Sequence, residues 1–207
     1  RFDEGWDSLR EKRMARIVHE GVLPADTTMS ERDPTQPAWT DAGHKAWEIR
    51  RMQAYAAQIE RMDKGIGRIV DALREGGVLD DTLFVFMSDN GASSEELPLV
   101  KLEQFVTRTD ICPPTARDGR PMRVGNSPDI VPGPEDTYAS YGRAWANLSN
   151  TPFPYYKRWV HEGGIATPLI VHWPAGGLKS GQVVDVPCQL VDIVPTILEA
   201  TGAAYPP

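Results

Sequence analysis

The chain has 207 residues, of which 41% are hydrophobic and 25% charged, so it is long enough for one sizeable domain with a hydrophobic core. Its formal net charge of −7 argues against a general affinity for nucleic acid, because phosphate binding requires a basic surface. Its apolar runs are strand-sized, far short of the roughly 20 residues that span a bilayer, so we expect no membrane span.

The first predicted element is a helix near the start of the chain. Apolar residues recur at roughly helical spacing over residues 6–18, and Gly21 follows as a plausible stop. Residues 22–40 contain three prolines among polar residues, which is typical of an extended connector.

A second, longer helix has the clearest pattern in the chain. Apolar side chains recur at three- and four-residue steps over residues 47–73, which places them on one helix face. Thr40 or Asp41 can cap its start, and Gly76-Gly77 should end it. Gly65 and Gly67 lie inside this helix, where we expect close packing against a sheet to explain their presence.

Two unbroken apolar runs predict strands that are buried on both faces. They lie at residues 83–87 and 168–173, and the first of them follows the long helix. Helix followed by buried strand indicates a parallel α/β sheet. A last helix is expected over residues 192–201, with Pro195 in its first turn and Gly202 as its stop. The proline-rich stretch 92–156, which lies between the two apolar runs, is expected to be a long irregular insertion.

The first chemical constellation, Ser88-Asp89-Asn90-Gly91, directly follows the first apolar strand. Ligands gather at the carboxyl ends of strands in open α/β sheets, and carboxylate and amide oxygens suit Ca²⁺ or Mg²⁺. Asn-Gly is also an ordinary turn with an aspartate cap. Taken alone, these four residues favour the plain turn.

The second constellation lies just before the second strand. Lys157 stands five positions ahead of Glu162, which is followed by Gly163-Gly164. A lysine beside a glycine pair could hold an oxyanion near the backbone. The alternative is a surface lysine on a loop that the glycines bend.

Together the two constellations form a specific order: Asp-Thr-Leu-Phe-Val-Phe, Ser-Asp-Asn-Gly-Ala, a long insertion, Lys-x4-Glu-Gly-Gly-Ile, Thr-Pro-Leu-Ile-Val-His-Trp-Pro and Val-Asp-Ile-Val-Pro-Thr-Ile-Leu. Over nearly all of residues 40–207 this order resembles the type I sulfatases of the alkaline-phosphatase-like superfamily, with arylsulfatases as the nearest branch. The resemblance implies an α/β fold, a mostly parallel sheet flanked by helices, of which this chain would hold only a part.

The resemblance also implies roles for individual residues. Asp89 and Asn90 match the family's metal-ligating pair, which binds Ca²⁺ in most members, with Mg²⁺ as an alternative. Lys157 matches the lysine that contacts the substrate sulfate, and Glu162-Gly163-Gly164 match a turn that we interpret as structural. His161 matches no required position, so we expect it to lie near the site or on the surface. His172 is expected to be packed in its strand.

Sulfatases of this type use a formylglycine nucleophile made from a cysteine or serine in a Cys-x-Pro-x-Arg-like motif, upstream of the Ser-Asp-Asn-Gly segment. Cys112 imitates that motif, but its arginine is one residue late and it lies downstream, so we reject it. The spacing of Cys112 and Cys188 fits no metal site, although the two could form one bridge. We therefore expect residues 1–207 to be the central-to-late part of a catalytic domain, with the nucleophile segment before it and a C-terminal subdomain after it.

The expected activity of the parent protein is hydrolysis of sulfate esters, of small molecules or glycans, whereas the 207 residues alone should be inactive. Two alternatives stay open: a phosphate or phosphonate ester hydrolase of the same superfamily, and a non-catalytic sulfatase-like module. Arg143, Trp145 and Asn150 are candidate pocket residues on their nearness to Lys157 alone. Bacterial relatives are frequently exported, which favours a periplasmic or extracellular location in a bacterium. The pattern carries no information on oligomeric state.

Overall fold

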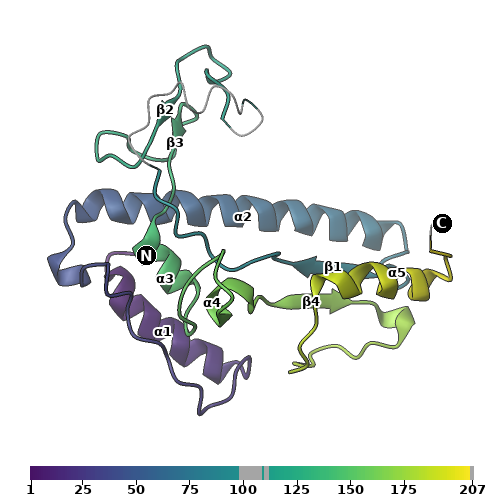
Figure 1. Cartoon of the computed structure of the whole chain (residues 1–207). Coiled ribbons are helices and arrows are strands. Elements are labelled where there is room, and N and C mark those ends of the chain that lie inside the picture. Colours follow the sequence, from purple (N-terminus) through teal and green to yellow (C-terminus); the bar gives the residue numbers. More distant parts are fainter. Residues whose placement is uncertain (98–108, 110–111, 206–207) are drawn as a thin grey trace. The chain divides into compact units, whose positions relative to one another are not determined.

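The structure is a computed structural model that describes residues 1–97, 109 and 112–205. The chain folds into two compact units: unit 1 is Arg1–Lys64 with Asn90–Ala166, and unit 2 is Gly65–Asp89 with Thr167–Pro207. The elements in chain order (Figure 1) are α1 (Gly5–His19), η1 (Trp39–Asp41), α2 (Lys45–Glu75), β1 (Phe84–Met87), β2 (Arg123–Val124), β3 (Thr137–Tyr138), α3 (Arg143–Ser149), α4 (Glu162–Ile165), β4 (Leu169–His172), η3 (Pro174–Gly176), η4 (Leu190–Asp192) and α5 (Ile193–Thr201).

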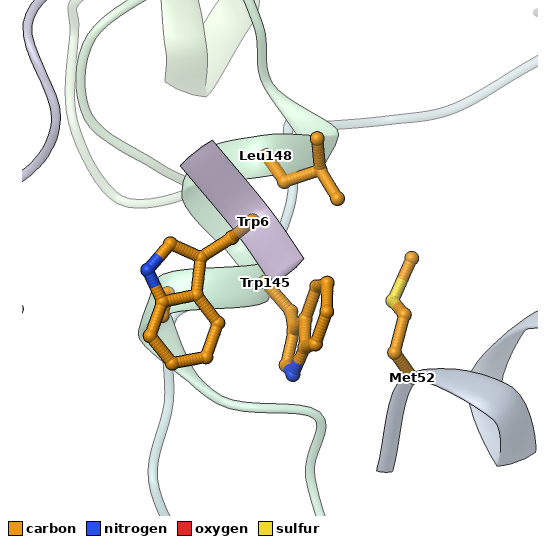
Figure 2. Close-up of a cluster of buried hydrophobic side chains, with 5 residues drawn as sticks. Trp6, Met52, Trp145 and Leu148 are labelled. Carbon is orange, nitrogen blue, oxygen red and sulfur yellow. The ribbon is translucent and has the colours of Figure 1, made fainter. Parts of the chain in front are cut away.

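The main core of unit 1 is a cluster of aromatic and aliphatic side chains from α1, α2 and α3. Trp145 of α3 is fully buried, and its ring lies between Trp6 of α1 and Met52 of α2 (Figure 2). The centroids of Trp6 and Trp145 are 5.3 Å apart with an interplanar angle of 87°, the edge-to-face arrangement that aromatic pairs prefer. The indole Nε1–H of Trp145 donates to Oε2 of Glu48 (3.2 Å). The indole donor of this buried ring therefore has a partner.

The expectation of an irregular insertion over 92–156 is wrong for its later part. That stretch contains α3, whose Trp145 anchors the core of unit 1, and the short parallel pair β2–β3. A second small core of Cys112, Ala116, Met122 and Val124 lies beside β2. The nine prolines of the stretch indicated its loops, but the seven-residue helix is too short to show a clear periodic signal.

In unit 2, β1 pairs with β4 in antiparallel register, with Phe84 opposite His172 and Met87 opposite Leu169. The sequence pattern predicted a parallel sheet, but this two-stranded sheet is antiparallel. A continuous apolar run is typical of parallel strands, yet it does not determine which two strands pair. The expected burial on both faces is also wrong: β1 is half-buried and β4 is exposed along its length.

The ends of the helices follow local signals with one exception. α2 ends at Glu75 before Gly76-Gly77, and α5 ends at Thr201 with Gly202 in a left-handed conformation (φ +68°), as predicted. The start of α2 was predicted at Thr40 or Asp41, but these residues form η1 and the helix begins at Lys45.

The two glycines inside α2 lie in an open part of the helix surface. A Cβ added to Gly65 or Gly67 would meet no heavy atom within 4 Å, so close packing against a sheet does not explain them. Within the described residues, none of the helices combines the length and the apolar character that a bilayer crossing requires.

Candidate functional site

Two segments far apart in the sequence are joined in unit 1 by a pair of backbone hydrogen bonds. The N–H of Gly91 donates to the carbonyl of Gly164 (3.0 Å), and the N–H of Lys157 donates to the carbonyl of Ala92 (3.1 Å). Asn90 belongs to the same unit and directly precedes Gly91. The segment that begins at Asn90 therefore runs beside the loop that carries Lys157, as a shared site would require.

The backbone of the Lys157 loop is strained on both sides of the lysine. Tyr155 and Arg158 have φ angles of +65° and +80°, a left-handed conformation that costs a non-glycine residue about 1–2 kcal/mol. Between them Tyr156 is 3% exposed, and its hydroxyl donates to Oδ2 of Asp33 (2.6 Å). Burial and this hydrogen bond raise the pKa of Tyr156 far above its usual value, so the phenol keeps its proton. The anchored turn fixes the point from which Lys157 leaves the backbone.

The side-chain amide of Asn150 connects three backbone segments around this loop. Its Oδ1 accepts a hydrogen bond from the N–H of Ala92 (2.9 Å). Its Nδ2 donates to the carbonyls of Tyr155 (2.8 Å) and Gly163 (2.7 Å). Asn150 directly follows α3, so the amide is mounted on the helix that carries the core tryptophan.

The glycine pair Gly163-Gly164 is structural, as predicted. Both residues are buried in the short helix α4, and an added Cβ would overlap the carbonyl of Pro154 at the first position and that of Trp159 at the second. A Cβ on Gly91 would likewise overlap the carbonyl of Gly163. These positions are occupied by glycine because the backbones approach too closely for any side chain.

A cavity of about 310 Å³ opens beside the loop. It lies within unit 1, and its walls come from the segment after Ala92, the start of α3 and the lysine loop: Ser94, Glu95, Glu96, Arg143, Lys157, Arg158 and Trp159. Three cationic side chains and two carboxylates therefore face one space. Such a cavity can hold a small oxyanion if the cations are not fully neutralised from within.

Glu95 is the internal partner of two of these cations. Its Oε1 lies 2.5 Å from Nη2 of Arg158, and its Oε2 lies 3.7 Å from Nζ of Lys157. The side chain of Lys157 is 35% exposed and that of Arg158 is 75% exposed, so solvent screens both pairs, and each contributes at most about 1 kcal/mol. A stronger anion could displace Glu95 at small energetic cost.

Glu96 and Arg143 are held by the surrounding structure. The carboxylate of Glu96 accepts hydrogen bonds from the backbone N–H of Arg143 (3.0 Å) and from Nη2 of the buried Arg51 (2.8 Å). The guanidinium of Arg143 lies 3.9 Å from Oδ2 of Asp33. The hydrogen bonds of Glu96 therefore hold the cavity wall in place, while Arg143 adds positive charge to the cavity.

The three pocket residues proposed from their nearness to Lys157 have different positions. Arg143 lines the cavity, so that prediction is confirmed. Trp145 does not: it is a core residue, because the helix turns its indole toward α1 and α2. Asn150 supports the loop from behind through hydrogen bonds and is absent from the cavity lining.

The sequence pattern did not identify Glu95, Arg158 and Trp159 as cavity residues. Arg158 and Trp159 directly follow Lys157, so position along the chain was their one available signal. Glu95 had none, because its ion pairs depend on a contact between segments more than sixty residues apart.

The two histidines considered in the sequence analysis are both exposed in the described structure. His161 is exposed, as expected, and its ring packs on Tyr155 with centroids 4.3 Å apart, next to the stacked pair of Tyr155 and Trp159. His172 was expected to be packed in its strand, but it is exposed at the end of β4.

Cys112 has the surroundings of a core residue. Its side chain is buried among Ala116, Met122 and Val124, and burial raises the pKa of the thiol, which disfavours the reactive thiolate. This supports its rejection as the source of a formylglycine. Cys112 and Cys188 are both free thiols, so they form no bridge with one another.

Asp89 and Asn90 offer a carboxylate and an amide oxygen, hard donors of the kind that Ca²⁺ and Mg²⁺ accept. Their donor chemistry fits a metal, but Ca²⁺ takes six to eight oxygens, so two side chains supply only part of a coordination shell. In the part of the chain that the structure describes, no group of three or more His, Cys, Asp or Glu side chains is arranged to hold a metal ion. The metal-binding role of this pair stays a prediction, as does the contact of Lys157 with sulfate.

Comparison with protein families gives one match over most of the chain. The family model described as Sulfatase matches residues 18–203. An uncharacterized sulfatase of Schizosaccharomyces pombe is 30% identical over 209 aligned residues, which cover 100% of this chain and 35% of the relative.

Two further relatives carry more specific names. An arylsulfatase of Klebsiella aerogenes is 30% identical over 205 residues, which cover 97% of this chain and 40% of that protein. A steryl-sulfatase of Mus musculus is 31% identical over 153 residues, which cover 74% of this chain and 18% of that protein. The chain thus spans well under half the length of each of these relatives.

Proposed function

The chain belongs to the sulfatase family, and on that premise we propose that the full-length protein hydrolyses sulfate esters, with Lys157 in contact with the sulfate group. Family membership implies an α/β fold of the alkaline-phosphatase-like type. We propose that in the full-length protein this fold has a mostly parallel sheet flanked by helices. The substrate would be the sulfate ester of a small molecule or a glycan.

One observation carries the assignment of the site. The loop of Lys157 is hydrogen-bonded to the segment that follows Asn90, and both contribute to the same unit. Lys157, Arg143 and Arg158 line one cavity, which supports the proposal that the sulfate oxygens bind there beside positive charge. Fixed positive charges beside an anionic reaction centre stabilise the negative charge that grows in the transition state, and this is often the largest catalytic contribution.

Asp89 and Asn90 would hold a divalent cation, Ca²⁺ or alternatively Mg²⁺, which would neutralise charge on the sulfate oxygens. The formylglycine nucleophile would lie in the part of the family's length that these 207 residues do not cover. In this proposal the described residues bind and orient the sulfate. The nucleophile and the remaining metal ligands would come from elsewhere in the protein.

The test of the proposed function is a comparison of two esters with the same leaving group. The full-length protein should turn over 4-nitrophenyl sulfate with a much higher kcat/KM than 4-nitrophenyl phosphate. Preference for the phosphate would overturn the proposal in favour of a phosphate ester hydrolase. If the protein turns over neither of these two esters nor any other sulfate ester, the result would favour a non-catalytic module. The 207-residue chain, assayed alongside, should show no turnover.

Replacement of Glu95 by glutamine should tighten the binding of inorganic sulfate to the full-length protein by about two- to fivefold. The substitution keeps the size of the side chain but removes the negative charge that pairs with Lys157 and Arg158, and one partly screened charge changes binding by up to about 1 kcal/mol. Isothermal titration calorimetry with sulfate measures the change.

The matched control for Glu95→Gln is Glu135→Gln. Glu135 forms a short ion pair with Arg117 (2.7 Å), both side chains are exposed, and neither residue lines the cavity. Its replacement should leave the sulfate affinity unchanged. Sulfate binding that weakens in Glu95→Gln, or that changes as much in the control, would contradict the anion site.

A further inference from the structure

We propose that Asn150 is a positioning residue for the sulfate site: its amide holds the loop on which Lys157 stands in the conformation that presents the lysine to the cavity. The inference rests on the proposed function for its catalytic consequence. The structural part of the inference, that Asn150 holds the loop in place, can be tested without any substrate.

The first support is the complete use of the amide's hydrogen-bonding groups. A primary amide has one carbonyl oxygen and two N–H donors. In Asn150 the oxygen accepts from Ala92, and the nitrogen donates to Tyr155 and Gly163, at distances from 2.7 to 2.9 Å. The side chains that have this donor and acceptor set are asparagine and glutamine, and asparagine is the shorter of the two. All three partners are backbone groups.

The second support is the closed ring of contacts around Lys157. Asn150 binds the N–H of Ala92, and the carbonyl of the same Ala92 accepts the N–H of Lys157 (3.1 Å). Asn150 also binds the carbonyl of Tyr155, two residues before the lysine. The amide therefore fixes both the segment at Ala92, to which the backbone of Lys157 is hydrogen-bonded, and the turn that precedes the lysine.

The third support is the strain in the turn. The φ angle of Tyr155 is +65°, which a tyrosine adopts only when its surroundings enforce it. The hydrogen bond from Nδ2 of Asn150 to the Tyr155 carbonyl is one such constraint, and Asn150 directly follows α3, whose Trp145 is fully buried. Without the amide, the turn should relax toward negative φ. A displacement of about 1 Å in a charged group at a reaction centre can cost roughly 100-fold in rate.

The test is a kinetic double-mutant cycle in the full-length protein with 4-nitrophenyl sulfate. Asn150→Asp keeps the shape and the acceptor but turns a carboxylate oxygen toward two carbonyls, and Asn150→Ala removes the amide without adding charge. Each should lower kcat/KM by about 10- to 100-fold. In a Lys157→Ala background the same changes should cost less than about threefold, because a residue that acts through Lys157 has no effect once Lys157 is gone.

Hydrogen exchange gives a readout that does not depend on turnover. In Asn150→Ala the backbone amides of Lys157 and Gly91 should exchange at least about tenfold faster, while the amides of α2 keep their protection. Ser149→Ala is the matched control: Ser149 directly precedes Asn150 at the end of α3, and its hydroxyl donates to the carbonyl of Trp145 (3.0 Å) in the same helix. That control should leave the exchange of Lys157 and Gly91 unchanged.

Each outcome decides between the two proposals. Equal losses in the presence and absence of Lys157, or unchanged exchange at Lys157, would overturn the positioning role of Asn150. An effect of Ser149→Ala as large as that of Asn150→Ala would do the same, because it would show general destabilisation. If the wild-type protein hydrolyses no sulfate ester, the proposed function fails, and the exchange measurement alone decides the role of Asn150.

Discussion

Replacing Lys157 with alanine in the full-length protein should lower kcat/KM for an aryl sulfate by about 100- to 1,000-fold. A unit charge about 4 Å from the sulfate in a partly buried site interacts with it by up to about 4 kcal/mol, and each 1.36 kcal/mol is a tenfold change in rate. Alanine removes that charge and leaves Glu95 and Arg158 to neutralise one another beside the substrate. Steady-state kinetics with 4-nitrophenyl sulfate measure the loss.

Two variants separate the charge of Lys157 from its place in the loop. Lys64→Ala is the matched control, because Lys64 is an exposed lysine on α2 that pairs with Glu60 (2.6 Å), and its loss should change kcat/KM by less than about twofold. Lys157→Arg keeps the charge in a different shape and should retain part of the activity. A loss below tenfold in Lys157→Ala, with an unchanged unfolding midpoint, would contradict the contact with sulfate.

The parts of the fold that could be predicted are those whose signals are local. A glycine pair ends α2 and Gly202 ends α5, because left-handed or flexible residues stop a helix wherever it packs. The direction of β1 relative to β4 could not be predicted in this way. Both strands are short apolar runs, and their antiparallel pairing depends on how the intervening eighty residues return the chain.

The residues of the candidate site likewise fall into those with a local sequence signal and those without one. Lys157 and the glycine pair after Glu162 could be proposed from their spacing along the chain; the structural role of Gly163-Gly164 is confirmed, and the sulfate contact of Lys157 stays a prediction. Glu95 could not, because a glutamate next to another glutamate is ordinary in sequence and gains its meaning from ion pairs with a distant loop. Asn150 was identified only by nearness, and its amide proves to hold three separate segments.

Trp145 illustrates why nearness along the chain is a weak guide. It lies two residues after Arg143, which lines the cavity, yet its indole is fully buried in the core of unit 1. Successive residues on a helix point about 100° apart, so Arg143 and Trp145 face opposite sides of α3. One face of this helix therefore contributes to the cavity wall, and the other is packed against α1 and α2.

Replacing Trp145 with alanine should destabilise the protein by about 3–5 kcal/mol, the usual cost when a large buried aromatic side chain is truncated. The indole contacts Phe2, Trp6 and Trp39 with centroid distances of 5.3 to 6.0 Å, and its loss opens a cavity that these rings cannot fill without moving. It also removes the hydrogen bond to Glu48, which adds about 1 kcal/mol. Urea unfolding of the full-length protein, followed by far-UV circular dichroism, should show a midpoint lower by about 1 to 1.5 M.

The matched control for this substitution is Trp159→Ala, because Trp159 is 49% exposed at the cavity wall and packs mainly on Tyr155. Its truncation should cost less than about 1 kcal/mol of unfolding free energy. Trp145→Phe should lie between the two, since the ring still fills part of the space but has no N–H for Glu48. Equal effects of Trp145→Ala and Trp159→Ala would contradict the core position of α3. Such a result would also contradict the view that α3 is a rigid support for Asn150, on which the positioning of Lys157 depends.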